Sequence, residues 1–395
     1  MRDRIISFLK KNPVILRFCW SFARYFLQFV GLFIRKHPKQ MLFASFGGRS
    51  FNDSPKAIYD EICKRSEFED WEIIWAFVNP DAIVVPRGKK IKIDSPSFFK
   101  ALLQSRVWIS NSGMDRNISL NIRNIIKVET WHGTPLKKIG GEEEQNSLGG
   151  KNIIKGPVDN ATIRCAQSQY DLKIFQRIFH ASEESFLLCD LPRNDELLMY
   201  SSSKVGSIKE TLNIPKNKKI ILYVPTYREY LWDDNGKNLI APPIHLANWK
   251  QKLGQEYILL FRAHYTIGTA LNIQTDEFLI DVSKYPNLND LYAIADMMIS
   301  DYSSCFFDYS ILDRPMFCFA YDLDEYKEKR GLYVDLTKEL PCRVNETEDE
   351  LLDDILRLNY FDSSEKTKLF HKKYAPNAGN ASCVVVNKIL ERLNK

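Results

Sequence analysis

The sequence predicts an α/β protein made of two doubly wound parallel-sheet domains. After Pro38, short apolar strands alternate with amphipathic helices, in two series separated by the polar, lysine-rich segment 201–219. Strands that alternate with helices form parallel sheets covered on both faces. A chain of 395 residues is also too long for one ordinary core. We therefore expect an N-terminal domain over 40–195, a C-terminal domain over 196–395 and a cleft between the domains.

The first series begins with QMLFASFGG (40–48), which predicts a strand that ends in a Gly-Gly turn. The segment 53–66 follows as a helix, because Ser54 can serve as the N-cap and Pro55 suits the first helical position. A further helical stretch is expected over 160–179. The other strands of this series are expected at 71–78, 106–112, 125–131 and 185–195.

The second series contains five apolar runs of strand length, again separated by helical stretches. Each run ends in polar or charged residues, which is typical of a buried parallel strand that leads into a loop. The strands of this series are expected at 219–228, 257–265, 276–283, 296–304 and 315–322.

Residues 1–39 form a separate N-terminal segment with a long apolar run, 14–34, that two arginines interrupt. Four polar residues of this run follow a spacing that places them in one narrow stripe of a helix: Arg17, Ser21, Arg24 and Gln28. Basic residues flank the run on both sides, and no secretory cleavage pattern is present. We expect an amphipathic helix at an anionic membrane surface, peripheral and on the cytoplasmic face, with its polar stripe in water and its apolar face in the membrane. A helix packed on the core of the protein is the alternative.

Composition excludes several classes of function. The net charge of +5 is too mild for general nucleic-acid binding. Eight cysteines without a CxxC pair indicate buried thiols in a reducing compartment. The six histidines lack the spacing of zinc ligands, so no structural metal site is expected. The absence of GxGxxG and GxxxxGK[ST] disfavours dinucleotide oxidoreductases and P-loop kinases.

Polar residues gather at the strand ends, where parallel sheets bind their ligands. His132 ends one predicted strand, and Gly133 and Thr134 allow a ligand to approach it closely. Ser112 ends another strand and would lie on the same edge. An imidazole with an ordinary pKa near 6.5 can accept a proton from a hydroxyl at neutral pH. A histidine that only caps the turn is the alternative.

The remaining strand-end residues are suited to an anion. Arg262 and His264 are two apart in an extended segment, so both side chains share a face. Arginine binds phosphate through two charge-assisted hydrogen bonds. The segment SDYSSCFFDYSIL reads as a strand followed by a helix start, where backbone N–H groups favour a phosphate, although a plain N-cap uses the same residues. The candidate phosphate-binding residues are Arg262, Ser303, Ser304, Asp301, Thr226, Arg228, Arg193 and Asn194.

These residues predict an anionic, nucleotide-like ligand in the interdomain cleft and a histidine base. The pair Asp322 and Asp324 matches a metal-binding DxD pattern, but its charged surroundings favour a solvated loop.

Several motifs together resemble the CDP-glycerol glycerophosphotransferase family of teichoic acid synthesis. The motifs are WHGTPLKKIG, YVPTYRE, RAHY, SDYSSCFFDYSILDRPMFCFAYDLDEY and RGLYVDL, with ASFGGRSFNDSPKAIYDEI, LPRND and NAGNAS as further similarities. The similarity runs from about residue 41 to the C-terminus, and the combination is specific although no single motif is. Family members often carry a proline after the second histidine, where this chain has Tyr265.

The resemblance implies a GT-B-like fold and transfer of glycerol phosphate or ribitol phosphate from a CDP-activated donor to a hydroxyl of a lipid-linked acceptor. His132 would correspond to the base and His264 to a second functional histidine. Serines of the DYSS motif and the arginines would hold the pyrophosphate. No cofactor or metal is expected, and a homo-oligomer is possible.

Two other functions are compatible with the residues. A GT-B glycosyltransferase that uses a nucleotide sugar would share the fold and the phosphate site. A membrane scaffold without enzymatic activity would tolerate replacement of His132. The donor polyol, the acceptor and the choice between primase and polymerase are not predictable from the sequence.

Overall fold

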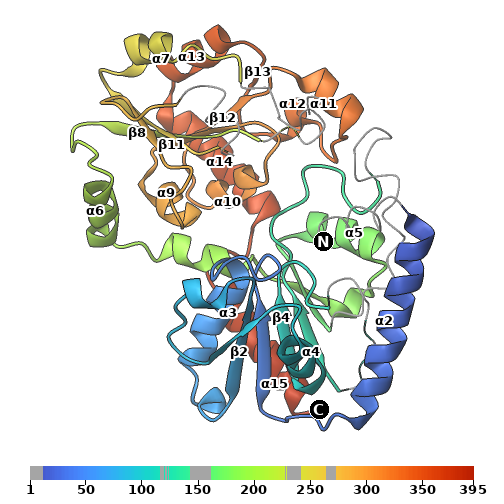
Figure 1. Cartoon of the computed structure of the whole chain (residues 1–395). Coiled ribbons are helices and arrows are strands. Elements are labelled where there is room, and N and C mark those ends of the chain that lie inside the picture. Colours follow the sequence, from blue (N-terminus) through green and yellow to red (C-terminus); the bar gives the residue numbers. More distant parts are fainter. Residues whose placement is uncertain are drawn as a thin grey trace. The chain divides into compact units, whose positions relative to one another are not determined.

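A computed structural model describes residues 12–115, 120, 122, 124–142, 162–226, 228, 242–263 and 273–395 (Figure 1). The chain divides into two compact units. Unit 1 comprises Met1–His132, Asn152–Arg193 and Asn380–Lys395, and unit 2 comprises Gly133–Lys151 and Asn194–Gly379. The units differ from the predicted domains, since 1–39 and the C-terminal 380–395 belong to unit 1, and 133–151 and 194–195 belong to unit 2.

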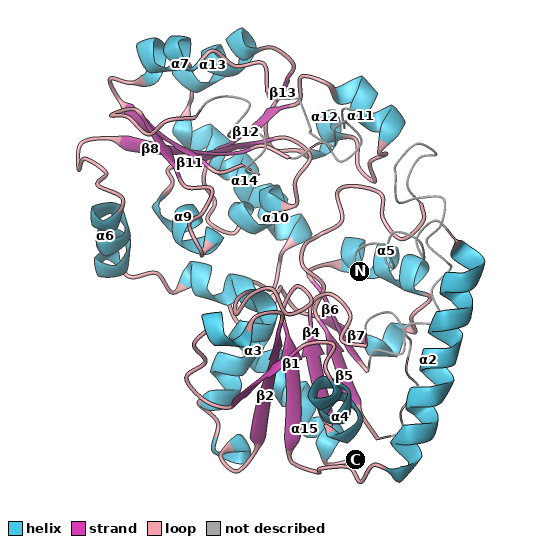
Figure 2. Cartoon of the chain, viewed as in Figure 1, coloured by secondary structure: helices cyan, strands magenta, loops and turns pink. Residues whose placement is uncertain are grey.

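Unit 1 contains a seven-stranded sheet in the order β3-β2-β1-β4-β5-β6-β7, and every strand pair is parallel (Figure 2). The order reverses at β1 and β4, which makes this strand pair the switch point of a doubly wound sheet. The strands are β1 (Gln40–Ala44), β2 (Glu72–Phe77), β3 (Lys89–Lys92), β4 (Val107–Ser110), β5 (Ile126–Glu129), β6 (Ile163–Ala166) and β7 (Phe186–Leu188).

Helices cover both faces of this sheet. Met41 and Phe43 of β1 lie in one core cluster with residues of α3 and α15, whereas Leu42 and Ala44 lie in another with residues of α4. The alternation of side chains along a strand produces this separation of the two faces. The helices are α2 (Pro13–Phe33), α3 (Asp53–Cys63), α4 (Pro96–Gln104), α5 (Gln169–Phe179) and α15 (Ala381–Leu393), with short 3-10 turns at Ser66–Phe68, Pro80–Ala82 and Glu183–Ser185.

Unit 2 contains a six-stranded parallel sheet in the order β10-β9-β8-β11-β12-β13. Its switch point lies between β8 and β11. The strands are β8 (Lys219–Val224), β9 (Tyr257–Phe261), β10 (Leu279–Asp281), β11 (Met297–Ser300), β12 (Met316–Phe319) and β13 (Val344–Asn345).

One face of this second sheet packs on α7 and α13, whose buried residues include Trp249 and Leu351. The helices are α6 (Ser202–Thr211), α7 (Leu246–Leu253), α9 (Leu288–Ile294), α10 (Cys305–Ser310), α11 (Leu323–Lys329), α12 (Leu336–Glu339), α13 (Glu348–Leu356) and α14 (Tyr360–Tyr374), with a 3-10 segment η5 (Pro192–Leu198) at the start of the unit.

The predicted class of two doubly wound parallel-sheet domains is confirmed, with local corrections. The expected helix over 160–179 was partly wrong, because β6 occupies its start and α5 begins only at Gln169. The strand β3 was missed because its sequence, KKIK, is charged and mostly exposed, as is usual for an edge strand. The N-cap of α3 is Asn52 and not Ser54, whose side chain is buried.

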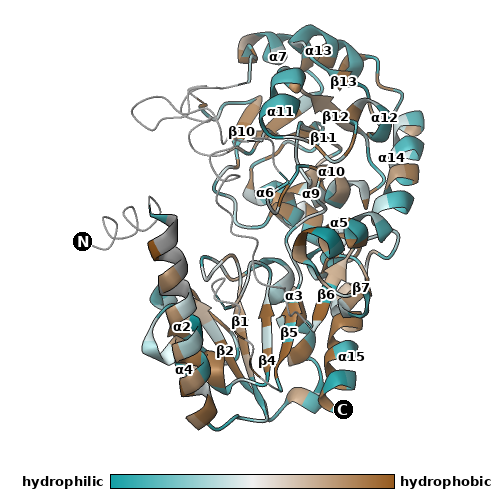
Figure 3. Ribbon diagram, turned by 90° about the vertical axis from the view of Figure 1, so that its right-hand side faces the viewer, coloured by the Kyte–Doolittle hydropathy of each residue, from teal (hydrophilic) through white to brown (hydrophobic). Residues whose placement is uncertain are grey.

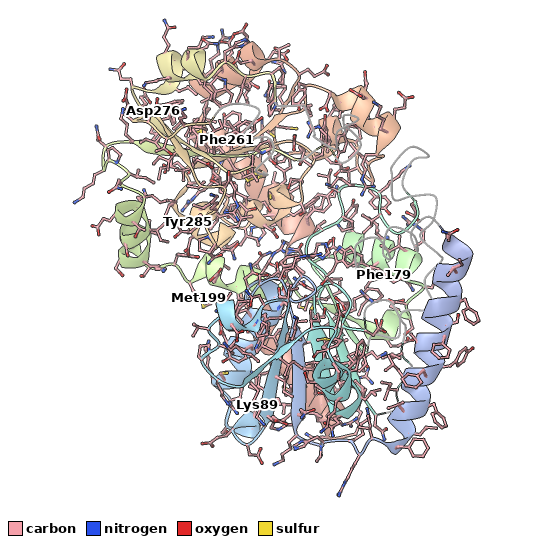
Figure 4. All side chains as sticks on the ribbon, in the orientation of Figure 1. Lys89, Phe179, Met199, Phe261, Asp276 and Tyr285 are labelled. Atoms are coloured by element: carbon pink, nitrogen blue, oxygen red, sulfur yellow. The ribbon has the colours of Figure 1, made fainter. Side chains whose placement is uncertain are left out.

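The N-terminal helix α2 exposes its aromatic residues. Phe22, Phe29 and Leu32 are 64%, 60% and 79% exposed, whereas Arg24 and Gln28 of the polar stripe are half-buried. Leu27 packs against the core cluster that contains α4. The expectation that the polar stripe faces water is therefore wrong for Arg24 and Gln28, because this side of the helix lies toward the core cluster that contains α4. Figure 3 shows hydrophobic patches along α2, and Figure 4 shows ring side chains that project from it away from the sheet.

None of the helices in the described ranges combines the length and the hydrophobicity needed to cross a membrane.

Candidate functional site

His132 lies three residues beyond the end of β5, on the carboxyl edge of the unit 1 sheet. Its Nδ1 atom lies 2.8 Å from the backbone oxygen of Asn111, the first residue after the neighbouring strand β4. Because a carbonyl oxygen only accepts, Nδ1 carries the proton in this hydrogen bond. In the neutral ring, Nε2 is then left with a lone pair that can accept a proton.

The imidazole of His132 lies between aromatic rings. The ring of Trp131 stacks on it with 4.4 Å between centroids, and the ring of Phe46 lies 5.8 Å away. Burial lowers the pKa of His132 below its ordinary value, and the positive charge of Arg193 adds to this effect. The hydrogen bond to Asn111 and the charge of Asp53 act in the opposite direction. A lowered pKa keeps the ring neutral, which is the form that can act as a base at neutral pH.

A buried polar network supports the two segments around His132. Asp53, the first residue of α3, accepts hydrogen bonds from the side chains of Asn111 (2.9 Å) and Arg193 (2.7 Å). Arg193 also donates to the backbone oxygen of His132 at 2.9 Å. Burial alone would raise the pKa of Asp53, but the charge of Arg193 and several hydrogen bonds lower it, so the carboxylate is ionised. Asp53 is a functional candidate that the sequence did not single out.

The residues expected on the acceptor side lie around this network. Ser112 accepts a hydrogen bond from the backbone N–H of Gly47 at 2.9 Å, which ties the loop after β4 to the loop after β1. Gly133 has a φ of 153°, a conformation that favours glycine, and it directly follows His132. Gly133 and Thr134 are buried and group with unit 2. The structure brings Ser112 and His132 to one edge of the unit 1 sheet.

Arg193 and Asn194 differ in their surroundings, although they are neighbours in the chain. Arg193 belongs to unit 1, where it binds Asp53 and the backbone of His132. Asn194 belongs to unit 2, where its side chain donates to Asp308 of α10 at 3.0 Å. Their expected contact with the donor phosphates stays a prediction.

In unit 2, Arg228 is buried in a network with two carboxylates. Its guanidinium donates to Asp301 at 2.8 Å and to both oxygens of Asp322 at 2.7 and 2.9 Å. The Arg228 side chain is only 1% exposed. Asp322 thus forms a buried ion pair, and the expectation of a solvated loop is wrong for this residue. The described donors of Arg228 are directed to protein groups, and its proposed contact with the donor stays a prediction.

Asp301 connects the ends of the two central strands of the same sheet. Its Oδ1 accepts from the backbone N–H groups of Thr226 (2.9 Å) and Tyr302 (2.7 Å), while Oδ2 accepts from Arg228. The hydroxyl of Thr226 is buried and has no hydrogen-bond partner among the described residues. These contacts fix the backbone at the switch point of the sheet.

Arg262 follows β9 and offers positive charge at this edge. Its Nη1 donates to the backbone oxygens of Tyr285 (2.6 Å) and Val282 (3.3 Å). Within the described ranges it forms no ion pair with a carboxylate, and burial lowers its pKa. A half-buried guanidinium without a carboxylate partner is a favourable site for an anion. His264, the other residue of the expected pair, lies outside the described residues.

Ser303 and Ser304 lie between β11 and α10, as the sequence predicted. The Ser303 hydroxyl accepts from the backbone N–H of Cys305 at 3.2 Å, and Ser304 is the N-cap residue without a side-chain cap bond. Both serines are half-buried. Their arrangement is that of a helix start, and their role in phosphate binding stays a prediction.

A second buried carboxyl group near His132 was not foreseen. Glu129, the last residue of β5, accepts from the backbone N–H of Gly113 at 3.2 Å and from that of Trp131. Burial raises the pKa of Glu129 to about 8, although the nearby Arg164 acts in the opposite direction. Glu129 is therefore largely protonated at pH 7. Glu129 and Arg164 are charged residues within the short strands β5 and β6, and this is the sequence signal that could have indicated the pair.

No group of three or more histidine, cysteine, aspartate or glutamate side chains suited to a metal ion occurs within the described part of the chain. The charged groups that the two sheet edges offer to an anion are arginines.

Comparison with known proteins gives a family match over most of the chain. A family model described as CDP-Glycerol:Poly(glycerophosphate) glycerophosphotransferase matches residues 25–391. The teichoic acid poly(glycerol phosphate) polymerase of Staphylococcus epidermidis is 37% identical to this chain over 315 residues. The match covers 77% of this chain and 43% of that protein. The teichoic acid glycerol-phosphate transferase of Staphylococcus aureus is 32% identical over 84% of this chain and 87% of its own length.

A solved structure of the wall teichoic acid polymerase TagF has a TM-score of 0.84 and 30% sequence identity, and the match covers 100% of this chain and 98% of that chain. A histidine variant of TagF soaked with CDPG matches with the same TM-score.

Proposed function

Because the chain belongs to the CDP-glycerol:poly(glycerophosphate) glycerophosphotransferase family, we propose that it transfers glycerol phosphate from CDP-glycerol to a hydroxyl of a teichoic acid precursor. The resemblance drawn from the sequence motifs is thereby confirmed, as is the GT-B-like fold class. We favour glycerol over ribitol as the polyol, because the description of the family and the names of both relatives refer to glycerol phosphate.

The observation that carries the proposal is the geometry of His132. Its Nδ1 is bound to the backbone oxygen of Asn111 at 2.8 Å, so Nε2 is the basic nitrogen. We assign this nitrogen to the proton of the acceptor hydroxyl. As Nε2 takes the proton, the hydroxyl oxygen forms a bond to the β-phosphorus of CDP-glycerol. The bond from that phosphorus to the oxygen shared with the α-phosphorus breaks, and CMP leaves with the electron pair.

On the donor side, Arg262 is the cation best placed to bind the pyrophosphate. It lies at the carboxyl edge of the unit 2 sheet and has no carboxylate partner among the described residues. Ser303 and Ser304 supply hydroxyls at the same edge, next to Asp301. We assign Arg228 and Asp301 to the support of this edge, because the hydrogen bonds of Arg228 are directed to Asp301, Asp322 and Thr226.

The exposed face of α2 accounts for access to a lipid-linked acceptor. Aromatic side chains such as Phe22 and Phe29 are exposed along this helix, and the exposed Arg35 and Lys39 follow it. Aromatic rings and cations together favour the headgroup region of an anionic membrane. We therefore propose a peripheral position on the cytoplasmic face of the membrane.

The test is a donor panel with a defined lipid-linked acceptor. CDP-glycerol, CDP-ribitol and UDP-sugars are supplied separately, and CMP or UDP release is measured together with the mass of the product. We expect CMP release from CDP-glycerol and an acceptor heavier by glycerol phosphate units. Transfer only from CDP-ribitol would show that the donor polyol is ribitol and not glycerol. Transfer only from a UDP-sugar would refute the proposal.

A further inference from the structure

Asp53 lies at the centre of the polar network beneath His132, although it does not touch the imidazole. Its two carboxylate oxygens accept hydrogen bonds from different side chains. Oδ1 accepts from the side chain of Asn111 at 2.9 Å, and Oδ2 accepts from Arg193 at 2.7 Å. Each of these partners then holds His132 through a backbone atom. The oxygen of Asn111 binds Nδ1 of the ring at 2.8 Å, and Arg193 binds the backbone oxygen of His132 at 2.9 Å.

The network also fixes the segment that carries Phe46. The side-chain oxygen of Asn111 accepts from the backbone N–H of Phe46 at 2.8 Å, and the ring of Phe46 lies 5.8 Å from the imidazole. One carboxylate thus connects three strand ends and the start of α3. The Asp53 side chain is 7% exposed and that of Arg193 is 14% exposed, so water competes little for these hydrogen bonds.

Three residues in this region have a strained backbone conformation. Phe46, Asp53 and Trp131 adopt φ values of 46°, 60° and 58°, in the left-handed region that non-glycine residues avoid. Both aromatic residues of this set pack on the imidazole of His132. Strained residues persist where the surrounding structure holds them, and they gather at functional sites. Here Asn111 binds the backbone of Phe46 and Arg193 binds the backbone of His132, and Asp53 accepts a hydrogen bond from each of these two side chains.

We infer that Asp53 is the positioning residue of His132: through Asn111 and Arg193 it fixes the ring with Nδ1 protonated and directs Nε2 to the acceptor. The inference rests on the proposed role of His132 as the base. Asp53 would thus orient the imidazole without a hydrogen bond to it. The backbone oxygen of Asn111 occupies the position at Nδ1 where a carboxylate could otherwise bind.

The charges of the network give the inference a readout that a purely structural role would not produce. Arg193 and Asp53 are the charged groups that act on the imidazole, the former lowering its pKa and the latter raising it. The groups in ring contact, Phe46 and Trp131, are uncharged. Glu129, which binds the backbone of Trp131, is largely protonated at neutral pH because burial raises its pKa to about 8.

The experiment compares Asp53→Asn with Arg193→Gln in the full chain. Histidine is labelled with ¹⁵N, the His132 ring signals are identified by their absence in His132→Asn, and their titration is followed by NMR. Asp53→Asn leaves the charge of Arg193 uncompensated, so the ring should titrate at lower pH than in the wild type. Arg193→Gln leaves the negative charge of Asp53 without the positive charge of Arg193, so the ring should titrate at higher pH than in the wild type. The acid limb of kcat/KM should move in the same two directions.

Asp53→Asn should also lower kcat by about 10², since a small displacement of a reacting group costs this much, with donor binding retained. Asp94→Asn is the matched control, because Asp94 has the same φ of 60° in the same unit and is exposed. It should leave the titration and kcat unchanged. If Asp53→Asn does not fold, Arg193→Gln decides by its shift alone.

Titration of His132 at the wild-type pH in both variants would overturn the inference. Failure of this inference about Asp53 is distinguishable from failure of the proposed function. If His132→Ala retained full turnover, the base would lie elsewhere, while the NMR titration would still show whether Asp53 holds the ring.

Discussion

Replacement of Arg228 by alanine should destabilise unit 2 strongly, because this arginine neutralises two buried carboxylates. The guanidinium makes three hydrogen bonds of 2.7–2.9 Å to Asp301 and Asp322, whose side chains are 2% and 9% exposed. It also lies 4.8 Å from the ring centre of Tyr302 and 5.3 Å from that of Tyr326. The alanine variant removes all these contacts and leaves both carboxylates without their counter-ion.

The magnitude follows from the burial of the pair. Breaking a buried ion pair by removal of one partner costs about 3–5 kcal/mol, because the remaining charge stays desolvated. A domain has about 5–15 kcal/mol of stability in total. We therefore expect Arg228→Ala to remove a large part of the stability of unit 2. Arg228→Lys should lose less, because it keeps the charge but not the paired geometry on Asp322.

Hydrogen exchange measured by mass spectrometry is the suitable assay, because it reports separately on each of the two compact units. Amides of β8 and β11 should lose protection in Arg228→Ala, while those of β1 and β4 should not. Arg343→Ala is the control, since Arg343 pairs with Glu350 at the surface and should cost no more than about 1 kcal/mol. Unchanged protection of β8 together with lost donor binding would refute the structural role of Arg228 and make it a ligand-binding residue.

Three other predictions concern the donor, the base and the membrane. Arg262→Ala should weaken CDP-glycerol binding by roughly 10- to 150-fold, the equivalent of a lost charge-assisted hydrogen bond of about 1.5–3 kcal/mol, as measured by calorimetry; an unchanged Kd would place the phosphate site elsewhere. Because the pKa of His132 is lowered and the neutral ring is the base, kcat/KM should fall on acidification only below the ordinary value of 6.5, and a midpoint above 6.5 would contradict this assignment. Replacement of Phe22, Phe26 and Phe29 by serine should reduce sedimentation with anionic vesicles at least about tenfold without loss of turnover on a soluble acceptor; unchanged sedimentation would show that α2 is not the membrane-binding surface.

The fold was predictable because buried parallel strands read as apolar runs with polar ends. This pattern located β1, β4, β5, β8 and β11, and it placed His132 and Arg262 on sheet edges. The pattern fails where a strand is not apolar. The edge strand β3 is KKIK, and β6 carries the buried Arg164, so neither has the expected composition.

The network beneath His132 was not predictable from local sequence. Asp53 and Arg193 are 140 residues apart, and their contact depends on the pairing of several strands. Asp53 reads as an ordinary residue at a helix start, and its left-handed φ is visible only in the structure. For Arg228, the sequence predicted an anion site from the position after β8, and it did not show the two carboxylates that bind this arginine, which follow β11 and β12.

The orientation of α2 illustrates a further limit. The spacing of Arg24 and Gln28 correctly gave a polar stripe and an apolar face. It did not determine which side the protein covers. Contact of Leu27 with the α4 cluster places Arg24 and Gln28 on the half-buried side of the helix and leaves the aromatic face exposed.

Single-turnover transfer by His132→Ala tests the central claim most directly. Wild-type and variant proteins are mixed with radiolabelled CDP-glycerol and a lipid-linked acceptor, and formation of the glycerol-phosphate product is followed by rapid quench. Donor binding is measured in parallel by calorimetry. Loss of a general base should reduce the rate of transfer by about 10² to 10⁴, while the Kd for CDP-glycerol stays near that of the wild type. Transfer by the folded variant at the wild-type rate would contradict the account.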